Sequence, residues 1–242
     1  ILGDELLEKK QQWHDIPADC ISVMCRAATE QLAPQVQHDI LMSNAYFVQI
    51  KERLIQTLTR TVRRLCEFSA ASDFHMEGLE KSFGRQDSPW EALHFLLSDG
   101  TEVIVTGQID RVDALRLGDK KYVVIIDYKS GRKQLDLSQV FTGLELQLLT
   151  YMFVALLNMG SDAVPAAVLY CYVRNDKTSL NHMATEEEKR DLYNKNSRLS
   201  GFYLEDSEVM QALDTSLQGY SAFLNLHLKK DGSLSNMSRN IY

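Results

Sequence analysis

Apolar residues recur every three or four positions in the first part of the chain. Between Ser43 and Ser69 they are Phe47, Ile50, Leu54, Leu58, Val62 and Leu65. This spacing predicts a long amphipathic helix whose other face is solvated or contacts phosphates. The basic residues assigned to that face are Lys51, Arg53, Arg60, Arg63 and Arg64. We expect residues 1–72 to form a helical N-terminal portion.

A β-like pattern begins near Phe74, where short runs of β-branched and aromatic residues replace the helical spacing. Strands are predicted near residues 74–83, 92–98, 102–115 and 121–129, as an antiparallel meander. Tight turns are marked by Asp99-Gly100 and Gly118-Asp119. The later elements are a helix over 144–158, a buried strand over 166–173, a polar excursion over 174–200, a helix near 205–213 and a hairpin at Asp231-Gly232. This order predicts an α+β fold, with residues 73–242 as its core and the whole chain as one composite domain.

Charged residues end the strand "VVIIDYKSG" (123–131), which a buried strand rarely allows without a reason. Pairing across a turn centred between Gly118 and Asp119 places Asp110 opposite Asp127 and Gln108 opposite Lys129. Opposed residues have Cβ atoms roughly 4.5–5.5 Å apart and point to the same face. The apolar pairs that this register creates are Val112–Ile125 and Ala114–Val123.

Two carboxylates so close repel each other by on the order of 4 kcal/mol. Either one of them stays protonated or a cation binds between them. Oxygen ligands on a rigid hairpin suit Mg²⁺, with Mn²⁺ as the alternative, and a lysine beside the metal could hold an attacking water. The other interpretation is an exposed hairpin end with an ordinary Asp–Lys pair.

Three motifs occur in order: "GQIDRVDAL" (107–115), "IIDYKSG" (125–131) and "LELQLLTY" (144–151). The set resembles the RecB-like branch of the PD-(D/E)xK nucleases, which implies a restriction-endonuclease-like core, a mixed central sheet flanked by helices. Further stretches resemble the nuclease domains of the AddB/RexB family of helicase–nuclease subunits. They are "EKSFGR" (80–85), "GLELQLLTYMFVAL" (143–156), "SRLSGFYLEDSEVMQALD" (197–214) and "KKDGSLS" (229–235).

The resemblance implies roles for individual residues. The metal ligands would be Asp110, Asp127, the backbone carbonyl of Tyr128 and Glu80. Lys129 would be the catalytic lysine, while Gln147 and Tyr151 would face the site and contact DNA or order the catalytic residues. Arg111 and Asp113 are motif positions that point to the opposite face by alternation, so we interpret them as structural.

The resemblance also implies an activity and partners. The chain would be a Mg²⁺-dependent deoxyribonuclease, an exonuclease that cuts DNA phosphodiesters by metal-activated water. It would belong to an ATP-dependent helicase–nuclease that processes double-strand breaks for recombinational repair, with a partner subunit of the AddA/RexA type. The alternatives are a stand-alone or CRISPR-associated nuclease of the same branch and a non-catalytic DNA-binding remnant of the fold.

Composition limits these interpretations. The net charge of −7 disfavours a free-standing DNA binder, so strand contact would be local, at Lys81, Arg85, Arg132 and Lys133. No apolar run is long enough to span a membrane, and four cysteines without a CxxC pair indicate reduced thiols, so a cytoplasmic location is expected.

Departures from the family pattern suggest a truncated domain. The family's histidine ligand is missing, and we expect the chain to be cut from a larger protein at both ends. Full-length relatives with an iron–sulfur cluster hold it through cysteines that have no match in this chain.

Overall fold

The computed structural model describes residues 1–36, 39–131, 137–173, 185–186, 188, 199–215, 222–228 and 234–235. Its N-terminal part is helical, as predicted. The bounds of the helices there are Leu2–Glu8 (α1), Ile21–Leu32 (α2) and Ala45–Ala70 (α3), with 3-10 turns at Trp13–Asp15, Ala33–Gln35 and Ile40–Met42. Asn44 starts α3, because its side chain accepts from the backbone N–H groups of Tyr46 and Phe47. No helix in the described ranges has the length and apolar character needed to cross a membrane.

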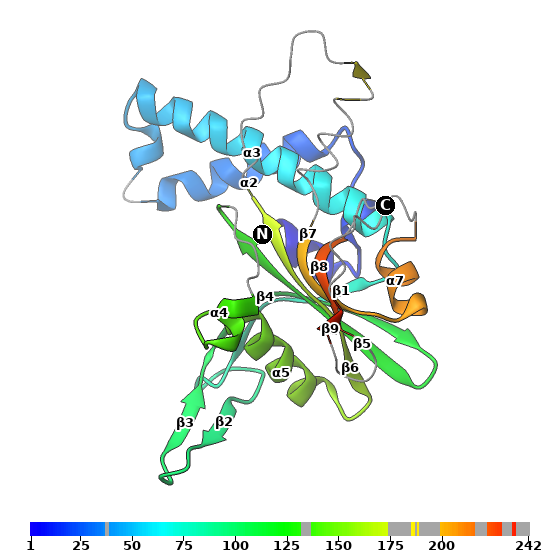
Figure 1. Cartoon of the computed structure of the whole chain (residues 1–242). Helices are drawn as coiled ribbons and strands as arrows, with labels where there is room; N and C mark the ends of the chain where they lie inside the picture. The colour runs from blue at the N-terminus through cyan, green and yellow to red at the C-terminus, as the bar shows by residue number, and fades with distance from the viewer. Residues whose placement is uncertain are drawn as a thin grey trace.

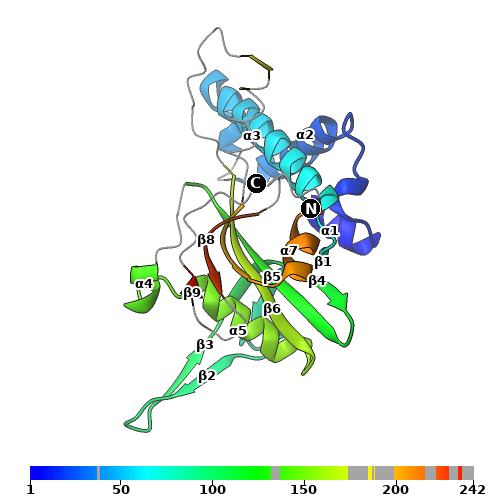
Figure 2. The ribbon, with the colours of Figure 1, turned by 45° about the vertical axis from the view of Figure 1, so that its right-hand side comes forward.

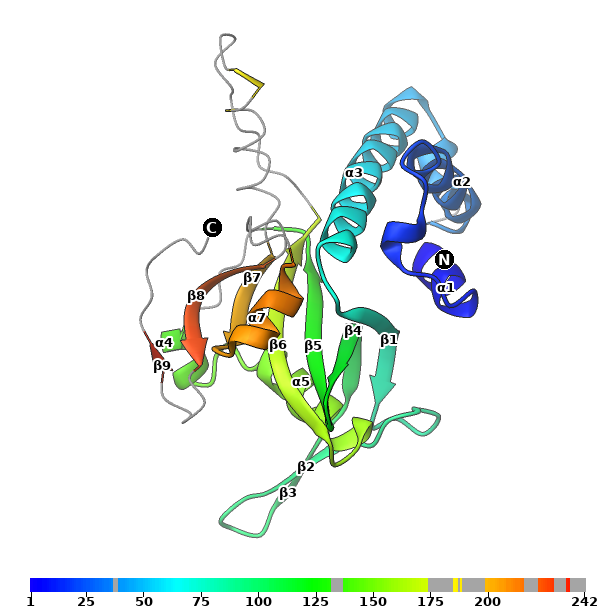
Figure 3. The same cartoon turned by 90° about the vertical axis from the view of Figure 1, so that its right-hand side faces the viewer.

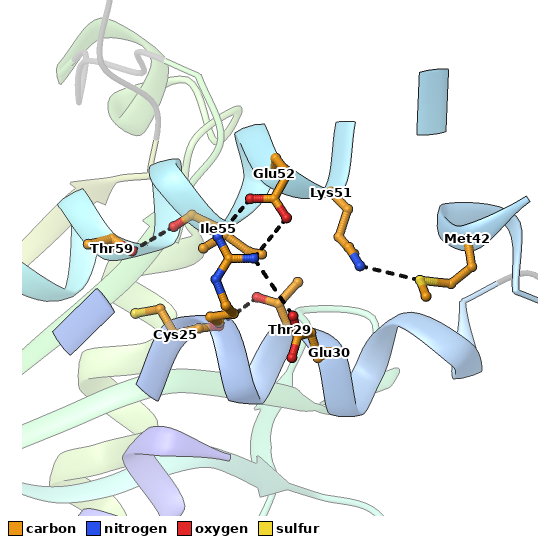
Figure 4. Close-up of polar contacts among 9 residues, drawn as sticks. Cys25, Thr29, Glu30, Met42, Lys51, Glu52, Ile55 and Thr59 are labelled. Atoms are coloured by element: carbon orange, nitrogen blue, oxygen red, sulfur yellow. Dashed lines mark hydrogen bonds and ion pairs between the residues drawn. The ribbon is translucent and has the colours of Figure 1, made fainter. Parts of the chain in front are cut away.

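The helices α2 and α3 pack side by side in an arm above the sheet (Figure 1). Arg26 on α2 donates to both carboxylate oxygens of Glu52 on α3, at 2.8 and 2.7 Å (Figure 4). Ile55 is buried in α3 in this part of the arm, whereas Val62 and Leu65 join the core cluster shared with the sheet. Successive parts of one long helix therefore face different neighbours.

This change of neighbours makes the predicted polar face of α3 partly wrong. Lys51 is only 7% exposed and its Nζ lies 3.4 Å from the Met42 sulfur, toward which it points in Figure 4. Arg64 is buried and donates to the Tyr172 backbone carbonyl at 3.1 Å. Conversely, Leu54 and Leu58 are exposed, because the apolar stripe drifts around a helix that meets two different surfaces.

The core is a mixed sheet, which confirms the predicted fold class. Its strands are His75–Phe83 (β1), Gly107–Leu117 (β4), Lys120–Lys129 (β5), Ala163–Tyr172 (β6), Leu199–Leu204 (β7), Ala222–Leu228 (β8) and Leu234–Ser235 (β9). The order in the described part is β1-β4-β5-β6-β7-β8-β9. The pairs β5–β6 and β7–β8 are parallel and the others are antiparallel.

Helices cover both faces of this sheet. Apolar residues of α3 and of α7 (Ser207–Leu213) pack in one cluster on one face, and Figure 3 shows α1, α2 and α3 on a single side of the strands. The helix α5 (Gln147–Met159) packs on the opposite face, with Leu148 and Ala155 buried against Val123, Ile125 and other residues of that face. A short helix, Leu137–Phe141 (α4), precedes α5. Side chains of β5 therefore alternate between two separate cores.

The predicted meander is wrong in one respect. Residues 102–115 form two strands, Glu102–Val105 (β3) and β4, which belong to different sheets. Leu93–Leu96 (β2) pairs only with β3, and this hairpin projects away from the main sheet (Figures 1 and 2). At the break, a Cβ on Gly107 would lie 2.9 Å from the Phe83 ring, so the chain enters the main sheet through a position that needs glycine.

The remaining predictions have mixed outcomes. The helix expected over 144–158 is α5, the strand expected over 166–173 is β6, and the helix near 205–213 is α7. The strand β7 was not predicted. The excursion at 174–200 lies almost wholly outside the described residues, as does the Asp231-Gly232 turn, although β8 and β9 on either side of that turn pair antiparallel. The boundary at residue 72 stays a prediction.

Candidate functional site

Asp127 lies near the end of β5, on the face that α5 covers. The two residues that precede it on this face, Val123 and Ile125, are fully buried in the cluster under α5. Asp127 is itself only 1% exposed. A carboxylate in such a place needs a charged partner, because burial disfavours its ionised form.

The predicted register of the β4–β5 hairpin is confirmed, including Val112 opposite Ile125. The ladder ends at Arg111–Ile126, so Asp110 and Asp127 lie one residue beyond the last pair. There the Asp110 carboxylate reaches across to β5 and accepts from the Tyr128 backbone N–H at 2.8 Å. The side chain of Asp110 is thereby fixed beside Asp127.

The Tyr128 backbone is oriented by the same contact. The N–H and C=O groups of one strand residue point to the same side of the strand. Since the Tyr128 N–H points to Asp110, the Tyr128 carbonyl also faces β4, where the resemblance implies a third oxygen ligand. Its ligand role stays a prediction.

Lys129 connects Asp127 to the start of α5. Its Nζ lies 2.5 Å from Asp127 Oδ2 and donates to Gln147 Oε1 at 2.9 Å. Gln147 in turn donates through Nε2 to the Tyr151 hydroxyl at 2.9 Å. These four side chains form one continuous run from the sheet to the helix. Gln108, expected opposite Lys129, instead donates to Glu80 at 2.6 Å, because the β4–β5 ladder has ended before it.

Tyr151 reports how closely the acidic groups gather. Burial raises the pKa of its hydroxyl, the Gln147 hydrogen bond lowers it, and the charges of Asp127, Asp110 and Glu80 raise it further. All three carboxylates are therefore within electrostatic reach of one side chain on α5. The ring also meets Phe83 edge-on, with centroids 6.1 Å apart.

Glu80 lies on β1 between the pairs Leu79–Arg111 and Lys81–Ile109, and so falls opposite Asp110. Its φ of 47° is in the left-handed region, which is costly for a residue with a side chain. Partial burial raises the pKa of Glu80, and the charge of Asp110 raises it further. Backbone strain of this kind is often found at functional sites, but the metal-ligand role of Glu80 stays a prediction.

Arg111 and Asp113 point to the other face of β4, as predicted. They form a buried bidentate ion pair with both N–O distances at 2.6 Å. Burial alone would lower the pKa of Arg111, but the adjacent Asp113 carboxylate holds it above its usual value. The guanidinium lies 5.8 Å from the centre of the Phe68 ring on α3. This pair belongs to the core that joins α3 to the sheet.

Two residues near Lys129 were missed by the sequence analysis. The Tyr170 ring on β6 lies 5.5 Å from Lys129 Nζ, and its hydroxyl donates to Glu145 at 3.2 Å. Glu145 stands inside the quoted motif "LELQLLTY", but nothing in its spacing indicated burial. Tyr170 lies in a run of apolar residues, and only the parallel pairing of β6 with β5 brings it beside Asp127.

The basic residues suggested for strand contact are only partly described. Lys81 is half-buried on β1, and Arg85 is exposed just beyond the end of that strand. Arg132 and Lys133 lie outside the described residues. Contact of these residues with DNA stays a prediction.

The donor atoms fit a hard divalent cation. In the described part of the chain, no three His, Cys, Asp or Glu side chains gather closely enough to hold a metal ion together. Mg²⁺, however, is usually bound by one or two carboxylates together with substrate phosphates and water. Asp110 and Asp127, with the Tyr128 carbonyl, match that smaller donor set.

Comparison with known proteins agrees with this geometry. One ATP-dependent helicase/deoxyribonuclease subunit, from Bacillus subtilis (strain 168), is 36% identical over 240 residues, which is 97% of this chain and 20% of that relative. Proteins of the same name from Lysinibacillus sphaericus (strain C3-41) and Listeria welshimeri are 33% and 34% identical, each over 21% of their own length. The chain thus spans about a fifth of the curated relatives that it matches.

The family match covers most of the chain. Residues 5–220 match the PD-(D/E)XK nuclease superfamily, a range that includes both sheet faces and every residue of the candidate site. Such membership implies the use of a divalent metal. The chain belongs to the PD-(D/E)XK nuclease superfamily.

Proposed function

We propose that this chain is the nuclease domain of a helicase–deoxyribonuclease subunit of the AddB type. It hydrolyses DNA phosphodiesters with Mg²⁺, or with Mn²⁺ in its place, and acts as an exonuclease on one unwound strand. The names of the relatives support DNA as substrate and an ATP-dependent helicase as the rest of the assembly. The sequence contains no P-loop, so we assign ATP use to other parts of the assembly and to an AddA/RexA-type partner subunit.

The observation that carries this proposal is the run of contacts from Asp127 through Lys129 to Gln147. Lys129 is held between a carboxylate and an amide oxygen, at 2.5 and 2.9 Å. Its side chain keeps 23% exposure, so the ammonium group can reach a substrate. An ammonium group held in this way can orient an attacking water and offset charge that develops on the phosphate.

Each of the other residues has a separate role. Asp110 and Asp127 hold the metal, with the Tyr128 carbonyl as a third ligand and Glu80 beside Asp110. Bound there, a divalent cation lowers the pKa of water and withdraws charge from the phosphate. Gln147 and Tyr151 order Lys129 from α5, whose N-terminus adds a positive dipole end near the scissile phosphate.

The order of effects at Lys129 and Gln147 tests this proposal. In the complete helicase–nuclease, Lys129→Ala should lower turnover on the strand that this domain cuts by about 10³-fold, because it removes charge from the reacting centre. Gln147→Ala should lower turnover by only about tenfold, because it removes a residue that orients Lys129. Strand-specific turnover is measured with each DNA strand end-labelled in turn.

Asn158→Ala is the matched control, since Asn158 is an amide on the same helix that bonds the Glu91 backbone far from the candidate site. Its turnover should equal that of the wild type. A larger loss for Gln147→Ala than for Lys129→Ala would mean that the two roles are assigned wrongly. Unchanged turnover in both variants would remove the nuclease proposal for this site.

A further inference from the structure

Lys129 has a third neighbour that the proposed mechanism does not use. Its Nζ lies 5.5 Å from the centre of the Tyr170 ring, in addition to its contacts with Asp127 and Gln147. A lysine side chain has four flexible carbons, so two polar contacts at one end leave it free to turn. An aromatic face under the ammonium group restricts that freedom, because the electron-rich ring attracts a cation.

Tyr170 is itself held in place from two directions. The parallel register of β5 and β6 aligns Tyr170 with Asp127, two residues before Lys129. The Tyr170 ring is fully buried, and its hydroxyl donates to a carboxylate oxygen of Glu145 at 3.2 Å. The position of the ring is therefore set by the sheet at one end and by a hydrogen bond at the other.

Glu145 ties this arrangement to α5. It is only 3% exposed and stands two residues before Gln147, the first residue of that helix. The start of α5 thus reaches Lys129 by two routes, directly through Gln147 and indirectly through Glu145 and the Tyr170 ring. A hydroxyl that donates to a carboxylate also makes its ring more electron-rich, which strengthens the attraction for the ammonium group.

We propose that Tyr170 and Glu145 are positioning residues that hold the Lys129 ammonium group over the Tyr170 ring, in line with Asp127 and Gln147. The inference rests on the proposed catalytic role of Lys129. Neither residue touches the substrate. A leucine at position 170 would fill the same space but would not attract the cation, so size and ring chemistry can be tested separately.

The first test observes Lys129 without any catalysis. NMR spectra are recorded on the chain labelled with ¹³C at lysine Cε, and the Lys129 signal is the one lost in Lys129→Arg. The ring should displace this signal upfield. Tyr170→Leu should abolish the displacement and Tyr170→Phe should retain it. Glu145→Leu should reduce it, while Glu145→Gln, which keeps an acceptor for the hydroxyl, should preserve it.

Tyr203→Leu is the control, since it removes another buried tyrosine, on β7, and should leave the Lys129 signal in place. A Lys129 signal at the same position in wild type and Tyr170→Leu would overturn the proposal. So would an equal displacement of that signal by Tyr203→Leu, because it would indicate a general loosening of the core.

The second test measures kinetics in the complete helicase–nuclease. Tyr170→Leu should lower kcat by about tenfold with the KM for DNA unchanged, and Tyr170→Phe should recover most of that loss. Failure of the proposed function looks different: Lys129→Ala would then leave cleavage intact, whatever the NMR spectra show. If Lys129→Ala abolishes cleavage but Tyr170→Leu keeps wild-type kcat, only the positioning inference fails.

Discussion

Asp127→Asn is expected to abolish cleavage of one DNA strand by the complete helicase–nuclease, with a loss of about 10³-fold or more. The substitution keeps the size of the side chain but removes its charge, and with it both a metal ligand and the ion-pair partner of Lys129. Cleavage is measured on each strand separately, because only the strand assigned to this domain should be affected.

The fold should survive this substitution. Lys129 keeps its hydrogen bond to Gln147 and is partly exposed, so its charge can still be solvated. We expect the free energy of unfolding to change by less than about 1 kcal/mol, measured by chemical denaturation. Wild-type cleavage by Asp127→Asn would contradict the metal assignment, whereas loss of cleavage together with unfolding would leave the chemical role of Asp127 without support.

Asp113→Ala should do the opposite and unfold the domain, because it leaves Arg111 as a buried charge without its carboxylate. Both side chains are almost completely buried, and two hydrogen bonds of 2.6 Å join them. Removing one partner of such a pair costs roughly 3–5 kcal/mol. Chemical denaturation of the chain, followed by circular dichroism, measures this difference directly.

The double variant Arg111→Met with Asp113→Val is the control for this second prediction. Replacing both charges by apolar residues removes the unpaired charge, so the double variant should be clearly more stable than Asp113→Ala alone. If Asp113→Ala has wild-type stability, the pair has no structural role, and the separation between a structural face and a reactive face of β4 is wrong.

Local patterns in the sequence were sufficient to predict the hairpin at the centre of the site. The Gly118-Asp119 turn and the alternation of apolar residues determine one register, and a slip of one residue would bury the wrong face. The α5 residues Gln147 and Tyr151 are one helical turn apart, so their common direction also follows from local geometry. Their contact with Lys129 depends on tertiary packing, for which the motif order served as a guide.

Other features depend on contacts between distant segments and left no local signal. Lys51 has the composition of a surface residue, yet it is covered because α3 meets a different neighbour there. The break at Thr106 follows from the close approach of Gly107 to Phe83, which a run of strand-forming residues conceals. Tyr170 resembles any other residue of a buried strand until the parallel pairing with β5 is known.

Metal binding tests the assignment of Asp110 and Asp127 most directly. Mn²⁺ is titrated into the chain by calorimetry, with a single-stranded oligonucleotide that resists cleavage present to supply phosphate oxygens. Binding should be clear for the wild type, at least about tenfold weaker for Asp110→Asn and for Asp127→Asn, and unchanged for Asp99→Asn in the exposed β2–β3 turn. Equal binding by all four proteins, or no binding by any of them, would contradict a metal site on the β4–β5 hairpin.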